Sequence, residues 1–188
     1  MKKFVIALIL LLTAAYGCSP SVKKTISPGF SETQPSTVAV MPVIWDSSGA
    51  KEDAEIAALF RKLTAGKLRA LNYAALPLED VDSKWTDSNA DAFLYIRIRA
   101  WDRDSFAGYV SLRVDASYEM YSKDGVRLWS AEYSTKESDL NLDERSREYG
   151  VFGTYEPRIE RLVEALLSTL PPGEPAKTAE KKFFQWLP

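Results

Sequence analysis

The chain has 188 residues and a mass of 21.1 kDa, which gives room for one domain of ordinary size or at most two small ones. Apolar residues make up 46% of it and charged residues 27%, a balance that can bury a core and that excludes a disordered polymer, a collagen-like repeat and a polytopic membrane protein. The 24 basic residues stand against 26 acidic ones, and because a nucleic-acid binder usually shows a basic excess, we expect no nucleic-acid partner.

The amino terminus, residues 1–17, has the three parts of a secretory signal peptide. Lys2 and Lys3 form a positive region, residues 4–12 an unbroken apolar run, and small residues follow. The apolar run is too short to span a bilayer stably as a membrane helix. We therefore expect a signal that is removed from the mature protein.

Cys18 is the only cysteine of the chain and follows Gly17 at the end of the small-residue region. This arrangement resembles the bacterial lipobox, in which the cysteine becomes the lipidated first residue of the mature protein. The resemblance implies a lipid anchor on Cys18, and Ser19 in place of an aspartate implies the outer membrane, with the chain facing the periplasm. The alternative is an ordinary secretory signal whose last residues include a cysteine.

The next segment, residues 19–36, contains three prolines, five serines and no apolar periodicity. Such a composition is typical of a tether and not of a fold element. Flexible chain of this length has a root-mean-square span of about 20–25 Å. We predict the lipidated cysteine and a flexible tether over residues 18–36.

The folded region is predicted to begin with a buried strand and a helix. Residues 37–45 are β-branched and apolar on both faces, as in a central strand, with Pro42 at its end or at a bulge. Residues 51–71 carry a helical apolar stripe with acids at the start and bases at the end, and Asn72 is the predicted stop. A short strand over residues 73–76 and a helical turn or loop over residues 77–84 follow.

Three further strands are predicted from alternating apolar and polar residues over 92–101, 109–121 and 126–135. The turn at residues 123–125 ends in a glycine that can supply the positive φ of a hairpin. Strands that follow one another so closely form an antiparallel meander with one apolar and one polar face.

A long polar loop over residues 136–156 leads to a second helix, which begins at Pro157 and has the strongest helical spacing of the chain. The prolines that begin the tail, residues 171–188, end it. The predicted fold is therefore a single α/β domain over residues 37–170, with two main helices packed on a mixed β-sheet that includes the meander.

Two motifs carry a resemblance to a known family over roughly residues 37–170. Ala90-Asp91-Ala92 leads into a strand, and Gly125 with Leu128-Trp129 forms a hairpin motif. These resemble a family of bacterial envelope lipoproteins whose fold is similar to the amino-terminal domain of TolB and to the periplasmic domain of curli-secretion-channel lipoproteins. The resemblance implies work in envelope assembly or export alongside a channel-type lipoprotein, without a known catalytic activity.

The sequence holds little that points to catalysis. It has no histidine, so neither a Ser-His-Asp system nor the usual zinc ligand sets can be built. Glu79, Asp80 and Asp82 form an acidic group without the spacing of a calcium loop, and we favour a solvated turn for them. Arg97 and Arg99 could form a site for an anionic ligand on the polar face of the sheet, but we favour pairing with charges on the neighbouring strand. We expect no catalytic residue, no metal and no cofactor.

Aromatic residues are the candidates for partner binding. Tyr95 and Trp101 fall on the polar face of their predicted strand, and exposed aromatic side chains often mark contact sites. A helix that covers this face would explain them equally well. The complete candidate set also includes one residue of the next strand and three of the tail: Tyr95, Trp101, Tyr121, Phe183, Phe184 and Trp186. The tail aromatics either pack on their own domain or bind a partner or a membrane surface.

These features predict an outer-membrane-anchored periplasmic lipoprotein that is not an enzyme. We expect its domain to bind an envelope protein such as a channel-type lipoprotein, or further copies of itself. One alternative is an envelope hydrolase or transferase that works with two carboxylates facing one cleft. Another is a protein that binds a small periplasmic ligand in an apolar pocket.

Overall fold

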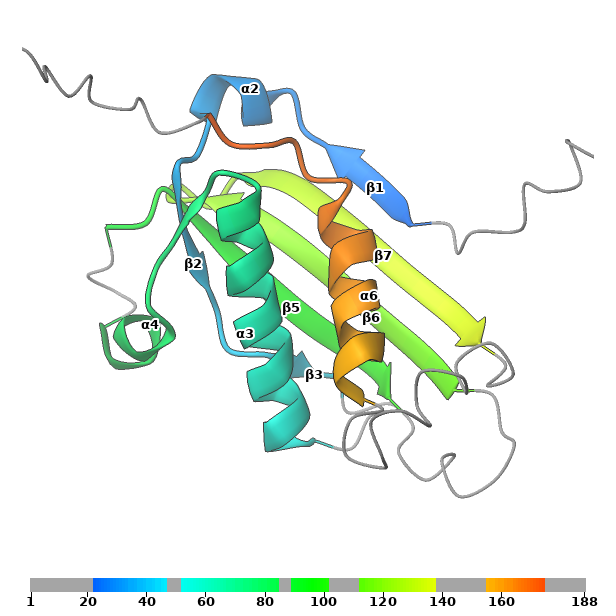
Figure 1. The fold of residues 1–188 in the computed structure, drawn as a ribbon. Coiled ribbons are helices and arrows are strands. Elements are labelled where there is room, and N and C mark those ends of the chain that lie inside the picture. Colours follow the sequence, from blue (N-terminus) through cyan, green and yellow to red (C-terminus); the bar gives the residue numbers. More distant parts are fainter. Residues whose placement is uncertain (1–21, 47–51, 85–88, 102–111, 138–154, 175–188) are drawn as a thin grey trace, which may run out of the picture.

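The computed structural model describes residues 22–46, 52–84, 89–101, 112–137 and 155–174, which form one mixed α/β domain (Figure 1). The predicted fold class is therefore confirmed. The described elements in chain order are β1 (Lys23–Ile26), α2 (Gly29–Thr33), β2 (Thr37–Val40), β3 (Ile44–Trp45), α3 (Ala54–Ala70), β4 (Ala74–Ala75), α4 (Leu78–Lys84), β5 (Ala92–Trp101), β6 (Leu112–Ser122), β7 (Arg127–Glu137) and α6 (Tyr155–Leu167).

The strands form a mixed sheet in the order β1-β7-β6-β5-β2-β4, with β3 paired to β5. The first four strands of this order are antiparallel neighbours, and β5, β2 and β4 run parallel to one another. The meander is thus β5, β6 and β7, as predicted. Its second turn ends at Gly125, where φ is +79°, a conformation that glycine adopts without strain.

Helices α3 and α6 cover one face of this sheet (Figure 1). Every second residue of β5, from Ala92 to Ile98, points into this layer and is fully buried. Helix α3 begins after Asp53, whose Oδ1 accepts hydrogen bonds from the backbone of Glu55 and Ile56 at 3.1 and 3.2 Å. It ends before Asn72, which has a φ of +69°, so the predicted stop is confirmed.

The predicted tether is wrong for most of its length. Strand β1 pairs with β7 from Lys23 to Ile26, and the backbone of Ser27 then donates to Leu128 O at 2.9 Å. Helix α2 follows and places Phe30 in the core with 8% exposure. Strand β1 is held by backbone hydrogen bonds at the sheet edge while its side chains stay exposed, so its sequence carries no apolar periodicity. The folded domain therefore includes β1 and α2 and does not begin at residue 37.

The predicted first strand is divided into β2 and β3, and Pro42 lies between them as expected. On the face of the sheet opposite α3 and α6, which we call the outer face, α4 covers the β2 edge through Val81, which packs with Ala39 and Met41. Within the described residues, no helix combines the length and the apolar character needed to cross a membrane.

Candidate functional site: a hollow on the outer face of the sheet

The outer face carries an open hollow of about 470 Å³, which we call the sheet hollow. Its floor is built from β5 and β6, because the residues that alternate with the buried ones on these strands point away from α3 and α6. Strand β3 and the β6–β7 turn supply its walls. The residues that line it are Ile44, Phe93, Tyr95, Arg97, Glu119, Tyr121, Ser122, Lys123 and Gly125.

Two tyrosine rings form the centre of the floor. The rings of Tyr95 and Tyr121 meet edge to face, with centroids 5.7 Å apart and planes at 84°. The register pairs Tyr95 with Glu119 and Phe93 with Tyr121, so the two tyrosines are diagonal neighbours across β5 and β6. Both are half-buried and leave aromatic surface open to the solvent.

Charged groups surround these rings. The hydroxyl of Tyr121 donates to Glu119 at 3.4 Å, and Arg127 Nη1 lies 3.8 Å from the same carboxylate. Burial, followed by the negative charge of Glu119, raises the pKa of Tyr121, whereas the cations Arg127 and Arg97 lower it; the net direction is upward. The phenol therefore stays neutral at physiological pH and can act as a hydrogen-bond donor.

Two of the predicted contact residues, Tyr95 and Tyr121, thus lie together in the sheet hollow. Phe93 and Ile44 share the lining and were not among the residues predicted from the sequence. Phe93 lies two residues before Tyr95 on the same face of β5, so the alternation that selected Tyr95 could also have selected it. Ile44 reaches the hollow only because β3 pairs with β5, from Arg97 onward, and this pairing has no sequence signal.

The placement of Trp101 on the polar face is wrong. A bulge between Ile98 and Ala100 adds one residue to β5, so Trp101 pairs with Val114 on the helix-covered side. Its ring meets Phe60 of α3 edge to face at 6.2 Å, and the side chain is only 5% exposed. Trp101 is therefore a core residue, and the exposure on which its predicted contact role rested is absent.

The remaining candidates, Cys18 and the tail residues Phe183, Phe184 and Trp186, lie outside the described residues. Arg99 has a charged partner, because its Nη2 lies 3.7 Å from Glu132 Oε2. This partner belongs to β7, so the predicted pairing of Arg99 with the neighbouring strand β6 is wrong.

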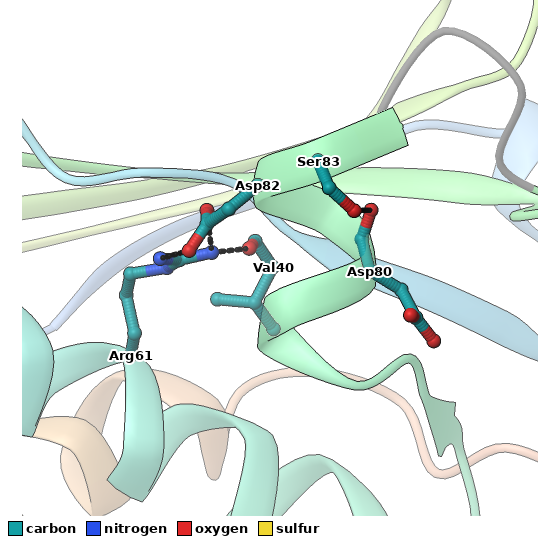
Figure 2. A network of polar contacts seen from close by, with 5 residues as sticks. All are labelled: Val40, Arg61, Asp80, Asp82 and Ser83. Carbon is teal, nitrogen blue, oxygen red and sulfur yellow. Dashed lines mark hydrogen bonds and ion pairs between the residues drawn. The ribbon is translucent and has the colours of Figure 1, made fainter.

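The acidic group at residues 79–82 lies in α4, and Asp82 has a structural partner (Figure 2). Arg61 of α3 holds this carboxylate with both terminal nitrogens, at 3.0 and 2.9 Å, and also donates to Val40 O at 3.1 Å. One side chain therefore joins α3, β2 and α4. Over the described ranges, no three side chains of the metal-binding types come close enough together to hold an ion.

No family model matches the chain, and no curated protein matches its sequence. Solved structures do resemble it. A dodecamer of a PelC point variant from Paraburkholderia phytofirmans is 18% identical with a TM-score of 0.54, over 81% of this chain and 98% of that one. A second PelC dodecamer from the same organism is 16% identical with a TM-score of 0.52, over 84% and 99% of the two chains. The lipoprotein GNA1162 from Neisseria meningitidis is 18% identical with a TM-score of 0.45, over 69% and 98%. At these identities, the likeness to the PelC structures shows a shared fold.

Proposed function

We propose that this chain is an outer-membrane-anchored periplasmic lipoprotein that assembles with further copies of itself and catalyses no reaction. The observation that carries the proposal is the likeness in fold to two PelC dodecamers, which extends over 81% and 84% of the chain. A fold that another protein uses in a dodecamer offers surfaces suited to self-assembly here.

The anchor in this proposal is Cys18, at the position of the lipobox cysteine. Because β1 begins at Lys23, only four residues separate the anchor from the sheet. The five Cα–Cα steps from Cys18 to Lys23 span about 18 Å at most when the chain is extended. The domain would therefore lie close to the membrane surface, with its edge strand nearest the bilayer, and neighbouring copies would be confined to one layer.

The sheet hollow is the surface that the proposal assigns to contact. Protein interfaces commonly combine a centre of aromatic side chains and arginine with a polar rim. The hollow has Phe93, Tyr95 and Tyr121 on its floor, beside Arg97 and Glu119. This composition supports binding to another protein surface.

The carboxylate-based hydrolase that the sequence left open requires two carboxyl groups facing one cleft. Of the residues that line the hollow, Glu119 alone carries a carboxyl group. That group is already in contact with Arg127 and the hydroxyl of Tyr121. The residues that line the hollow therefore favour binding of a protein surface over carboxylate-based hydrolysis of a glycoside.

Two measurements test the proposal. Metabolic labelling with a palmitate analogue should mark the wild-type protein in the outer-membrane fraction and should leave Cys18→Ser unmarked. Light scattering on the purified protein should give a mass of several chains. Equal labelling of both proteins would contradict the lipid anchor on Cys18. A monomeric mass at every protein concentration would contradict the proposed self-assembly.

A further inference from the structure

We propose that two copies of this chain pack outer face against outer face, with helix α4 of each copy seated in the sheet hollow of the other. The inference rests on the proposed self-assembly and names the two surfaces that produce it. Each copy contributes the same two surfaces, so the contact is isologous and has a two-fold axis between α4 and the hollow.

Helix α4 and the sheet hollow are neighbours on the outer face. Val81 of α4 packs with Ala39 and Met41, and Phe93 and Tyr95 from the floor of the hollow pack against this same small cluster. The helix therefore stands on the sheet as a ridge beside an open depression of about 470 Å³. A two-fold rotation about an axis between them turns each ridge toward the hollow of the other copy.

The lining of the hollow has an excess of positive charge. Its carboxylate, Glu119, already lies beside Arg127. Arg97 is exposed, and no carboxylate of the described residues forms an ion pair with it. Lys123 is also exposed and acts through space on Asp91, a carboxylate that already accepts three hydrogen bonds. The hollow therefore favours an occupant with negative charge.

The exposed side of α4 carries this negative charge. Glu79 and Asp80 are both exposed, and no basic side chain in the described part of the chain pairs with either of them. Arg61 holds Asp82 instead, and Asp80 points away from that contact (Figure 2). Two carboxylates of α4 can therefore meet the cations in the hollow of a second copy.

The acids that point outward from the strands of the sheet have partners within their own copy. Glu119 and Glu132 each lie beside an arginine, and Asp115 accepts a hydrogen bond from Ser134. The exposed acids of α6, such as Glu160, belong to the helix layer on the opposite face. Of the described helices, α4 is therefore the one that brings unpaired acids to the outer face.

Apolar surface in the hollow adds to the charge match. Exposed ion pairs by themselves contribute little, because water and salt screen them. Ile44 in the lining is 37% exposed, and the half-buried rings of Tyr95 and Tyr121 leave aromatic surface open. A helix seated in the hollow would remove these groups from water, which stabilises the contact and strengthens its ion pairs.

An exchange of charges tests the contact directly. All proteins comprise the chain from residue 18 onward, which contains every described element, and carry Cys18→Ser. One variant has Arg97→Glu with Lys123→Glu in the hollow, and the other has Glu79→Lys with Asp80→Lys on α4. Each variant alone places like charges in both halves of the contact, so we expect its self-association to weaken about tenfold or more.

A mixture of the two variants should restore association. In a mixed pair, the acidic α4 of one protein meets the unchanged hollow of the other, and the basic α4 meets the acidic hollow. Sedimentation at a series of concentrations measures association, and circular dichroism checks the fold. Lys62→Glu with Arg69→Glu, exposed on α3 in the helix layer, makes the same change in net charge and should leave association unchanged.

The outcomes separate this inference from the proposed self-assembly. If the parent protein assembles and both variants assemble equally well, the inference fails and the self-assembly stands. If each variant is weakened but their mixture associates no better than either alone, α4 does not pair with the hollow and the inference also fails. Glu79→Gln with Asp80→Asn removes the charges without reversing them and should also weaken association; unchanged association would overturn the inference. If the parent protein is itself monomeric, both proposals fail.

Discussion

The hydroxyl oxygens of Thr64 and Tyr118 lie 2.7 Å apart in the interior between α3 and β6. Both residues are fully buried, so this bond satisfies polar groups that have left water. Burial raises the pKa of Tyr118 far above its usual value, and the bond from Thr64 offsets only part of that rise. The phenol therefore stays neutral, and the bond joins the helix layer to the sheet.

Removing either member of this pair should destabilise the fold. Thr64→Val or Tyr118→Phe leaves one buried hydroxyl without its partner, and we expect each to lower the free energy of unfolding by about 1–3 kcal/mol. The double variant has no stranded hydroxyl and should lose less than the sum of the two. Urea unfolding of the four proteins measures this coupling, and strictly additive losses would show that the bond contributes nothing.

Asp91 links the start of β2 to the start of β5. Its Oδ2 accepts from the Ser36 hydroxyl at 2.7 Å and from the backbone of Ser36 and Thr37 at 3.0 and 2.9 Å. Burial by itself raises the pKa of this carboxyl, but the bonds from Ser36 and Thr37 and the charge of Lys123 outweigh it, and the net pKa is lowered. A lowered pKa in the folded state gives stability that is present above the unfolded pKa near 4 and is lost as the pH falls through the folded value.

Asp91→Asn should therefore reduce stability at neutral pH and should flatten its decline below about pH 4. Thermal unfolding at a series of pH values from about 2.5 to 7 measures this effect. The same exchange at Asp124, an exposed turn residue, controls for the loss of one negative charge. If both variants follow the same pH curve, the hydrogen bonds of Asp91 are not the cause.

Two glycines should respond to alanine in opposite directions. A Cβ at Gly173 would lie 2.9 Å from Asn72 O and 3.2 Å from Asn72 C, so the backbone itself would have to move, and we expect a loss of about 1–3 kcal/mol. A Cβ at Gly66, inside α3, would meet no atom within 4 Å, and Gly66→Ala should raise stability by about 0.5–1 kcal/mol. Chemical unfolding of both variants tests the pair. Stabilisation by Gly173→Ala would contradict the close packing after α6.

The contact between Arg61 and Asp82 predicts a structural role for the acidic group in α4. Arg61 is 12% exposed and Asp82 51%, so the arginine has the larger share of buried surface. We expect Arg61→Met to cost about 1–3 kcal/mol through the lost hydrogen bonds, and Asp82→Asn to cost under about 1 kcal/mol because solvent screens its charge. Addition of Ca²⁺ should not change the melting temperature of the wild type. A rise that Asp82→Asn abolishes would identify a metal site in place of a structural contact.

The fold could be predicted where local chemistry fixes it. Asn72 ends α3 and Gly125 closes the β6–β7 turn, each at a positive φ that few other residues adopt. The alternation over β5 and β6 likewise predicted that Tyr95 and Tyr121 lie on the face of the sheet opposite the buried residues.

The incorrect and missed predictions arise from strand pairings between segments that are distant in the sequence. Strand β1 has the sequence of a tether because backbone bonds to β7, and not apolar side chains, hold it in place. Trp101 lies on the other face because one extra residue in β5 reverses the alternation beyond Ile98. Ile44 joins the hollow through a parallel pairing with β5. Each of these depends on register, which a single stretch of sequence does not specify.

The central claim is that the chain assembles through the outer face of its sheet, and native mass spectrometry tests it most directly. The chain from residue 18 onward, with Cys18→Ser, is compared with the same protein carrying Tyr95→Ser and Tyr121→Ser. We predict a discrete multimer for the first and a monomer for the second, with matching circular dichroism spectra. A monomeric parent protein, or a tyrosine variant of unchanged assembled mass, would contradict the claim.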